Sequence, residues 1–129
     1  MFAERDLSID ADLGRLREAR EWAERAAQEF GFAADHCYQV KLAMSEAVAN
    51  AIQHGSATPQ DPIHISARAG RDELIFEVRD TGEYQEPPEQ PEMSESGRGL
   101  VLVQLVMDEM QLAPGKEGSV LRFVKRRRR

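Results

Sequence analysis

Apolar residues recur every three or four positions in the first quarter of the chain, a spacing that predicts an amphipathic helix. Asp10 or Asp12 can cap the start of this helix, and Gly31 suits a left-handed stop at its end. Residues 2–9 precede the helix and alternate weakly, so a short first strand is expected there. The core stripe of the helix is expected to be Leu13, Leu16, Ala23, Ala26 and Phe30.

A second helix is predicted from Ala34 to His54, because the same period continues and Gly55 then offers another stop. Glu46, Asn50 and His54 recur on it every four residues and therefore share one face. A polar row of this kind beside an apolar stripe either meets water or lines a site. The stripe itself is expected to be Val40, Met44, Ala47 and Ala51.

The pattern then changes to a period of two, which is typical of half-buried strands. Residues 63–69 alternate between apolar and polar, residues 70–72 form a plausible hairpin turn, and residues 74–78 continue the alternation. Carrying this parity forward places Asp80 on the core-facing side, at the end of a strand. A carboxylate buried there needs a partner, because unpaired burial is costly.

Residues 83–97 contain three prolines and five glutamates and are expected to form a long lid or connecting loop. An apolar helix is predicted to start at residues 97–99, and a short strand is expected near Met110–Ala113. The chain closes with a strand on which Ser119, Leu121 and Phe123 share one face. This order predicts one α+β domain over residues 1–129, a two-layer sandwich with helices on one face of a mostly antiparallel sheet.

Composition narrows the function classes. The chain is acidic, with a formal net charge of −6, which argues against a protein that coats nucleic acid. The basic run at residues 125–129 is expected to be a solvated tail. Cys37 is the only cysteine, which excludes an internal disulfide and a multi-cysteine zinc site. We found neither a signal pattern nor a membrane-length apolar run, so a cytoplasmic protein is expected.

The helix pair of Glu46 and Asn50 offers specific chemistry. An asparagine amide oxygen suits a hard cation such as Mg²⁺, which keeps water and phosphate oxygens as its other ligands. A glutamate one turn earlier can accept a proton from a hydroxyl group or position a water molecule. The alternative for the pair alone is a polar helix edge that faces solvent.

Three further segments are weak signals by themselves and indicate a nucleotide site only together with Glu46 and Asn50. Asp80 can accept a hydrogen bond from the exocyclic amine of adenine, with Gly82 allowing a sharp turn, although a plain strand-end turn fits equally well. Gly97 and Gly99 open a helix whose free N–H groups attract phosphate, or they form a flexible joint. Ser119 could join Asp80 in binding the base.

Together the motifs resemble a known family. Glu-x-x-x-Asn at 46–50, Asp-x-Gly at 80–82 and Gly-x-Gly at 97–99 occur in the order of the GHKL ATPase superfamily, which has the Bergerat nucleotide fold. The segments KLAMSEAVANAIQHG, FEVRDTGE and ESGRGLVLVQLVMDEM look most like the anti-sigma-factor serine kinases of the RsbW type. The resemblance covers nearly the whole chain and implies ATP and Mg²⁺ as cofactors.

The resemblance also implies a role for each position. Glu46 would be the general base that faces the substrate serine, and Asn50 would hold Mg²⁺ between the phosphates. Asp80 would bind the adenine amine. His54 matches a histidine common in the family, either as a phosphate contact or as a helix-end residue. The remaining positions are Gly82 at the adenine wall, Ser119 in place of the usual threonine, and Gly97, Arg98, Gly99 and Leu100 as phosphate contacts at the lid hinge.

The function implied by the resemblance is an Mg²⁺/ATP-dependent serine kinase. It would phosphorylate an anti-sigma-factor antagonist and hold a sigma factor inactive, as a homodimer in which Trp22 lies either at the dimer contact or in the core. A nucleotide-gated binding switch with little kinase activity is the alternative. The acidic lid favours the switch, and the intact Glu46 argues against it. A kinase acting on a stress-signalling phosphatase is a third option. No membrane or direct nucleic-acid partner is expected.

Overall fold

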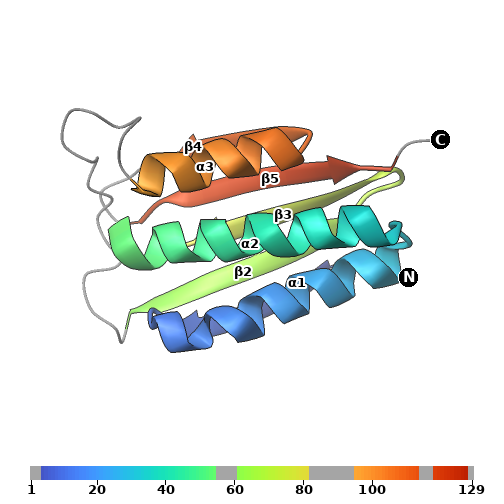
Figure 1. Cartoon of the computed structure of the whole chain (residues 1–129). Coiled ribbons are helices and arrows are strands. Elements are labelled where there is room, and N and C mark those ends of the chain that lie inside the picture. The colour runs from blue at the N-terminus through green and yellow to red at the C-terminus, as the bar shows by residue number, and fades with distance from the viewer. Residues whose placement is uncertain (1–3, 55–60, 82–94, 114–117, 128–129) are drawn as a thin grey trace.

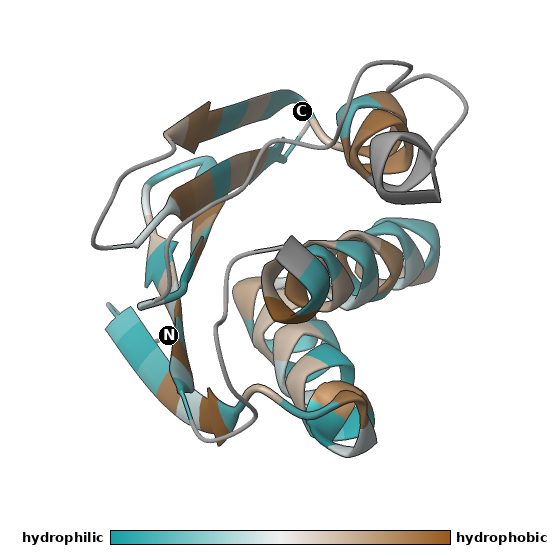
Figure 2. Cartoon of the chain, turned by 90° about the vertical axis from the view of Figure 1, so that its left-hand side faces the viewer, coloured by the Kyte–Doolittle hydropathy of each residue, from teal (hydrophilic) through white to brown (hydrophobic). Residues whose placement is uncertain are grey.

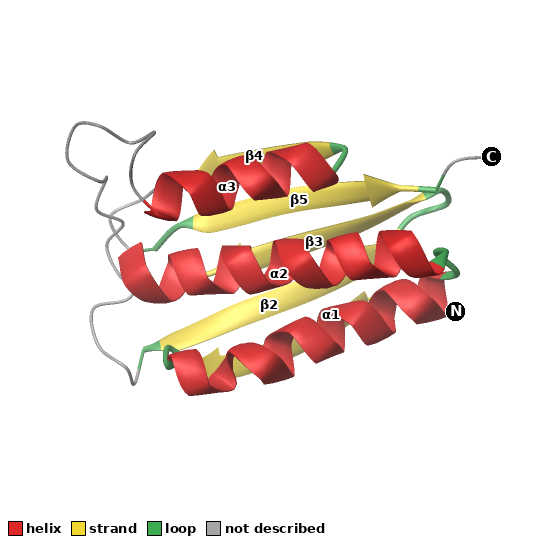
Figure 3. Cartoon of the chain, in the orientation of Figure 1, coloured by secondary structure: helices red, strands yellow, loops and turns green. Residues whose placement is uncertain are grey.

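The computed structural model describes residues 4–54, 61–81, 95–113 and 118–127, and it forms two layers (Figures 1 and 3). A five-stranded sheet, in the order β1-β2-β3-β5-β4, pairs antiparallel throughout. All three helices lie side by side on one face of the sheet (Figure 2), as the sequence predicted. The elements are β1 (Glu4–Asp10), a 3₁₀ turn (Leu13–Arg15), α1 (Leu16–Phe30), α2 (Ala34–His54), β2 (Pro62–Ala69), β3 (Glu73–Arg79), α3 (Glu95–Val106), β4 (Glu109–Ala113) and β5 (Val120–Arg126).

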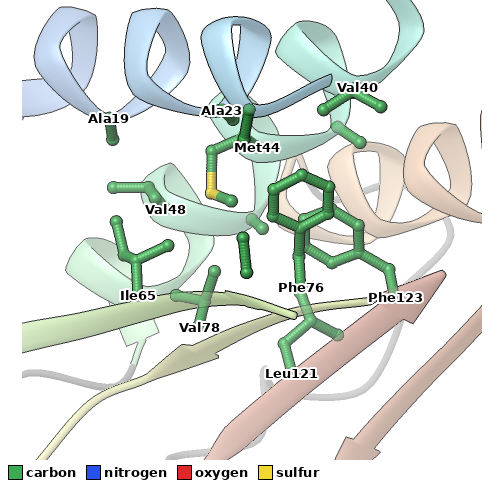
Figure 4. Close-up of a cluster of buried hydrophobic side chains, with 14 of the residues drawn as sticks. Ala19, Ala23, Val40, Met44, Val48, Ile65, Phe76, Val78, Leu121 and Phe123 are labelled. Carbon is green, nitrogen blue, oxygen red and sulfur yellow. The ribbon is translucent and has the colours of Figure 1, made fainter. Parts of the chain in front are cut away.

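Small side chains set the contact between the first two helices. Ala19 and Ala23 of α1 are fully buried and lie above Met44 and Val48 of α2 (Figure 4). Alanines let two helices approach closely, because they leave little side-chain volume between the backbones. Gly31 ends α1 in a left-handed conformation with φ 103°, and its N–H donates to two helix carbonyls. The predicted stop at this residue is confirmed.

The sheet contributes the other half of the core. Phe76 of β3 and Phe123 of β5 are paired residues on neighbouring strands, and their rings stack with centroids 5.3 Å apart. Both are fully buried beneath the helices (Figure 4). The predicted stripe of α2 is likewise buried, as are the alternating apolar residues of β2 and β3 except Ala69, which is partly buried at the end of β2. The periodicities of 3.6 and 2 therefore located the core correctly.

Two boundaries differ from the prediction. Leu13 is 53% exposed and belongs to the 3₁₀ turn, which Asp12 caps by accepting from the Gly14 N–H at 2.9 Å. It therefore does not belong to the core stripe. Helix α3 begins at Glu95, so residues 95–97, expected in the lid, are helical. The rest of the predicted lid and Gly55 lie outside the described residues.

The basic run at the end of the chain is partly built into the fold, which corrects the prediction of a solvated tail. Lys125 is only 7% exposed, and its Nζ donates to Gln39 Oε1 of α2 at 2.6 Å and to the Val106 carbonyl at the end of α3 at 2.7 Å. A cation is favourable at a helix C-terminus. The Arg127 guanidinium lies 4.2 Å from the centroid of the Phe30 ring, a cation–π contact. Within the described residues, no helix is both long enough and apolar enough to cross a membrane.

We expect Lys125→Met to destabilise the domain by about 1–3 kcal/mol, because it leaves two acceptors beneath α3 without their donor. Urea unfolding measures the difference. Arg122→Met serves as the control, since it removes a cation from the other face of the same strand, and it should change stability by less than about 0.5 kcal/mol. Equal losses in the two variants would contradict a specific role for Lys125.

Candidate nucleotide site

Asp80 and Ser119 join the end of β3 to the start of β5. Both are almost fully buried, at 3% and 4% exposed. Ser119 Oγ donates to Asp80 Oδ2 at 2.5 Å, and the Ser119 N–H donates to Asp80 Oδ1 at 3.2 Å. The Asp80 N–H in turn donates to the Ser119 carbonyl at 3.1 Å. Each carboxylate oxygen can accept more than one hydrogen bond, so the pair fixes the carboxylate and leaves it able to accept a further donor.

Gly118 makes this close approach possible. Its φ is +140°, and a Cβ at this position would lie 2.3 Å from the Asp80 carbonyl oxygen. No side chain fits at that distance, so the two backbones meet only because residue 118 is glycine. The sequence motifs assigned Gly118 no role of its own. The signal available was a glycine directly before a serine proposed to bind the base.

Helix α2 presents Glu46 and Asn50 beside its core stripe. Glu46 is partly exposed, whereas Asn50 is 7% exposed. The Asn50 Oδ1 atom is buried and finds no hydrogen-bond partner among the described residues. A buried acceptor without a donor costs about 1–3 kcal/mol. The orphaned oxygen therefore points to a ligand that supplies a positive charge or a donor.

This orphaned amide oxygen fits Mg²⁺. The described residues contain no cluster of three or more histidine, cysteine or carboxylate side chains that could hold a metal. A cation at Asn50 would therefore take its other ligands from water and from phosphate oxygens, as Mg²⁺ does in nucleotide sites.

The elements that carry the motifs meet at one end of the domain. The C-terminal end of α2, the start of α3, the end of β3 and the start of β5 all lie on the left in Figure 1. Helix α2 contacts both β3 and α3. Leu100 of α3 is partly buried and packs against the core. The backbone of residues 97–99 lies in the first turns of α3.

Other predicted positions are less defined. Gly82 lies outside the described residues, and the structure describes no side chain for His54 or for residues 97–99.

Cys37, the lone thiol, is buried and donates to the Phe32 carbonyl at 3.4 Å. Burial raises the pKa of this thiol, and the carboxylates of Glu24 and Asp35 raise it further. Cys37 is therefore a structural residue and not an activated nucleophile.

Comparison with known proteins identifies the family. The model of the histidine kinase-like ATPase domain matches residues 9–125. The chain belongs to this family. A protein of Bacillus licheniformis named serine-protein kinase RsbW is 30% identical, with 79% of this chain and 74% of that protein covered. A protein of Oceanobacillus iheyensis named anti-sigma F factor is 33% identical, with 67% of each chain covered. The resemblance seen in the sequence is thus confirmed.

Solved structures confirm the histidine kinase-like ATPase fold. The crystal structure of RsbU and RsbW domains from Mycobacterium tuberculosis matches 97% of this chain with a TM-score of 0.76, at 23% identity. This chain spans about a third of that protein, since it covers 32% of it. The histidine kinase domain of a blue-light activated kinase from Erythrobacter litoralis matches with a TM-score of 0.58, at 16% identity. Membership of an ATPase family implies the use of ATP.

We expect Gly118→Ala to destabilise the domain by about 2 kcal/mol or more and to weaken adenine-nucleotide binding, because the added methyl group forces β3 and β5 apart at Asp80. Urea unfolding and nucleotide titration measure the two effects. Gly14→Ala is the matched control: its Cβ would meet only the Asp12 side chain, at 3.4 Å or more. Its stability should stay within about 1 kcal/mol of the parent. A stable Gly118→Ala variant with normal nucleotide binding would contradict the proposed strand contact.

Proposed function

We propose that this domain is an Mg²⁺/ATP-dependent protein serine kinase that modifies an anti-sigma-factor antagonist and sequesters a sigma factor. The observation that carries the proposal is the buried, unpartnered Oδ1 of Asn50 one turn from Glu46, in a domain that also buries the Asp80 carboxylate. The names of the relatives, serine-protein kinase RsbW and anti-sigma F factor, support both halves of this function.

Each of the chain's own residues has a defined task in this mechanism. Asp80, held by Ser119, accepts a hydrogen bond from the adenine amine. The role expected for Gly82 stays a prediction from the sequence, because this residue lies outside the described part of the chain. Asn50 supplies one oxygen ligand to Mg²⁺, which neutralises phosphate charge when it is bound.

Glu46 accepts the proton of the substrate serine hydroxyl as that oxygen attacks the γ-phosphorus of ATP. The bond from this phosphorus to the β–γ bridging oxygen breaks at the same time, and ADP leaves. Residues 97–100 lie in the first turns of α3 and face the phosphates in this proposal. Because α3 begins at Glu95, the backbone N–H groups of Gly97 and Arg98 are among the four that stay free to donate to phosphate.

The partners follow from the same proposal. A sigma factor and its antagonist act in the cytoplasm, so the kinase would act there as well. We also propose a homodimer, in line with the resemblance.

Trp22, which was expected either in the core or at a dimer contact, is partly buried and packs against the core. The core placement therefore explains Trp22 without a dimer.

A hollow between α1 and α2 offers a docking point for an acidic partner. It has a volume of about 140 Å³ and is lined by Arg20, Tyr38, Lys41, Leu42 and Ser45. The Arg20 Nε atom is buried and has no hydrogen-bond partner among the described residues, and Tyr38 is 61% exposed. An unused guanidinium donor beside an exposed ring and a leucine suits a carboxylate with a neighbouring apolar side chain.

Glu46→Gln should abolish transfer from labelled ATP to a serine-bearing antagonist, with a loss of about 10²–10⁴-fold in rate, while ATP still binds. Glutamine keeps the size of the side chain but cannot accept the proton. Glu21→Gln, on the exposed face of α1, is the control and should keep full activity. Transfer that survives Glu46→Gln would remove the assignment of the base. Tight ATP binding by the parent without transfer to any antagonist would instead favour the nucleotide-gated switch.

Arg20→Ala should weaken binding of the antagonist or sigma factor by about tenfold or more, because the partner carboxylate loses its guanidinium. Nucleotide affinity should not change, since Arg20 lies outside the nucleotide site. Arg71→Ala removes a solvent-exposed arginine that lines neither this hollow nor the nucleotide site, and it serves as the control. Calorimetric titration with each partner measures the effect, and equal affinities for the two variants would contradict this docking point. Capture of a phosphatase in place of either partner would support the third option.

A further inference from the structure

Strand β1 forms one edge of the sheet, and only β2 pairs with it. The opposite side of β1 therefore carries backbone N–H and C=O groups that no described strand satisfies. An edge of this kind is a template for another strand unless the protein protects it. Two of the larger hollows in the described part of the chain lie against this strand, one on each face of the sheet.

The hollow on the outer face is acidic. It has a volume of about 340 Å³ and lies over β2, between Glu4, Asp6 and Ser8 of β1 on one side and Glu77 and Arg79 of β3 on the other. Two of the groups that line it are engaged, since Arg79 lies 3.4 Å from Glu77 and His64 Nδ1 forms a hydrogen bond with Ser8 at 2.8 Å. Arg68 of β2 is paired with Glu4 in the strand register, so Asp6 is the carboxylate of β1 that lies farther from a cation. Glu4 and Asp6 form no ion pair within the described ranges, so their charge is available to a ligand.

The groove on the helix face is different. It lies between β1 and α1, has a volume of about 480 Å³, and includes Leu7 and Trp22. The charges at its rim largely cancel, because Arg17 pairs with Glu21 at 3.0 Å and Glu18 pairs with Arg15 at 2.6 Å. A side chain that enters this groove therefore meets an aliphatic and an aromatic surface between neutralised ion pairs.

We propose that β1 binds an extended segment of a partner protein in which basic and apolar residues alternate. Such a segment would add a sixth strand to the sheet, since side chains of a strand point alternately to its two faces. On the outer face its basic residues would lie beside Glu4 and Asp6 of β1, and on the helix face its apolar residues would enter the groove beside Trp22. The carboxylates of Glu4 and Asp6 would attract a strand with basic residues and repel a strand with acidic residues.

A second copy of this chain does not fit as the occupant through β1 itself. Glu4, Asp6 and Asp10 all point to the outer face. Antiparallel pairing of two such strands would bring carboxylates opposite one another, and like charges at directly opposed positions destabilise a sheet. The charge of this edge therefore selects a partner with basic residues. None of the proposed nucleotide contacts lies on β1 or α1, so this edge is separate from the nucleotide site.

The test uses the full chain without nucleotide and a synthetic ten-residue peptide that alternates lysine and valine. Trp22 is the only tryptophan, so its fluorescence reports directly on the groove. We expect the lysine–valine peptide to shift this fluorescence and to slow hydrogen exchange of the β1 amides. The same peptide with N-methylated backbone amides should bind at least tenfold more weakly, because it cannot form the ladder. A glutamate–valine peptide should not bind.

Charge variants separate a specific edge from general attraction to an acidic protein. Asp6→Asn should weaken binding of the lysine–valine peptide about two- to fivefold, as expected for one exposed charge pair. Gln111→Lys, on the exposed side of β4 at the far edge, raises the net charge by the same amount and should leave the affinity unchanged. The proposal is overturned if no peptide shifts Trp22, if N-methylation has no effect, or if the two variants weaken binding equally.

Discussion

The contact between Asp80 and the Gly118–Ser119 segment is the constraint on which the rest of the site depends. It closes β3 onto β5 and, in the same hydrogen bonds, fixes a buried carboxylate. Without it, burial of that carboxylate would be costly. The absence of a side chain at position 118 allows the contact, because any Cβ would overlap the Asp80 carbonyl. One glycine thus links the stability of the sheet to the candidate adenine pocket.

Helix α2 serves the core and the site at once. Its apolar stripe packs under α1 and onto the sheet, while the adjacent row carries Glu46 and Asn50. The unpartnered amide oxygen of Asn50 is a local cost, and the surrounding buried residues offset it. A buried acceptor without a donor is expected at a site where the side chain binds a ligand. Lys125 donates hydrogen bonds to Gln39 of α2 and to the Val106 carbonyl at the end of α3, so one buried cation connects the two helices.

Charge is distributed unevenly over this acidic protein. The outer face of β1 is acidic, while the hollow between α1 and α2 presents Arg20 and Lys41. These surfaces lie on different elements and would attract partners of opposite charge. A kinase that must choose between protein partners can use such separate surfaces, because partner choice is a difference between affinities.

The elements, most of the core and the family could be predicted from the amino-acid pattern. The periods of 3.6 and 2 are local properties, so they located the helices, the strands and the inward face of Asp80, although Leu13 and the start of α3 were misplaced. The motifs at residues 46–50 and 80–82 indicated the nucleotide chemistry. The strand order, the demand for glycine at position 118 and the burial of Lys125 emerged only from the folded chain. These features depend on contacts between segments far apart in the sequence, such as Asp80 and Ser119, which are 39 positions apart, and no local pattern encodes such contacts.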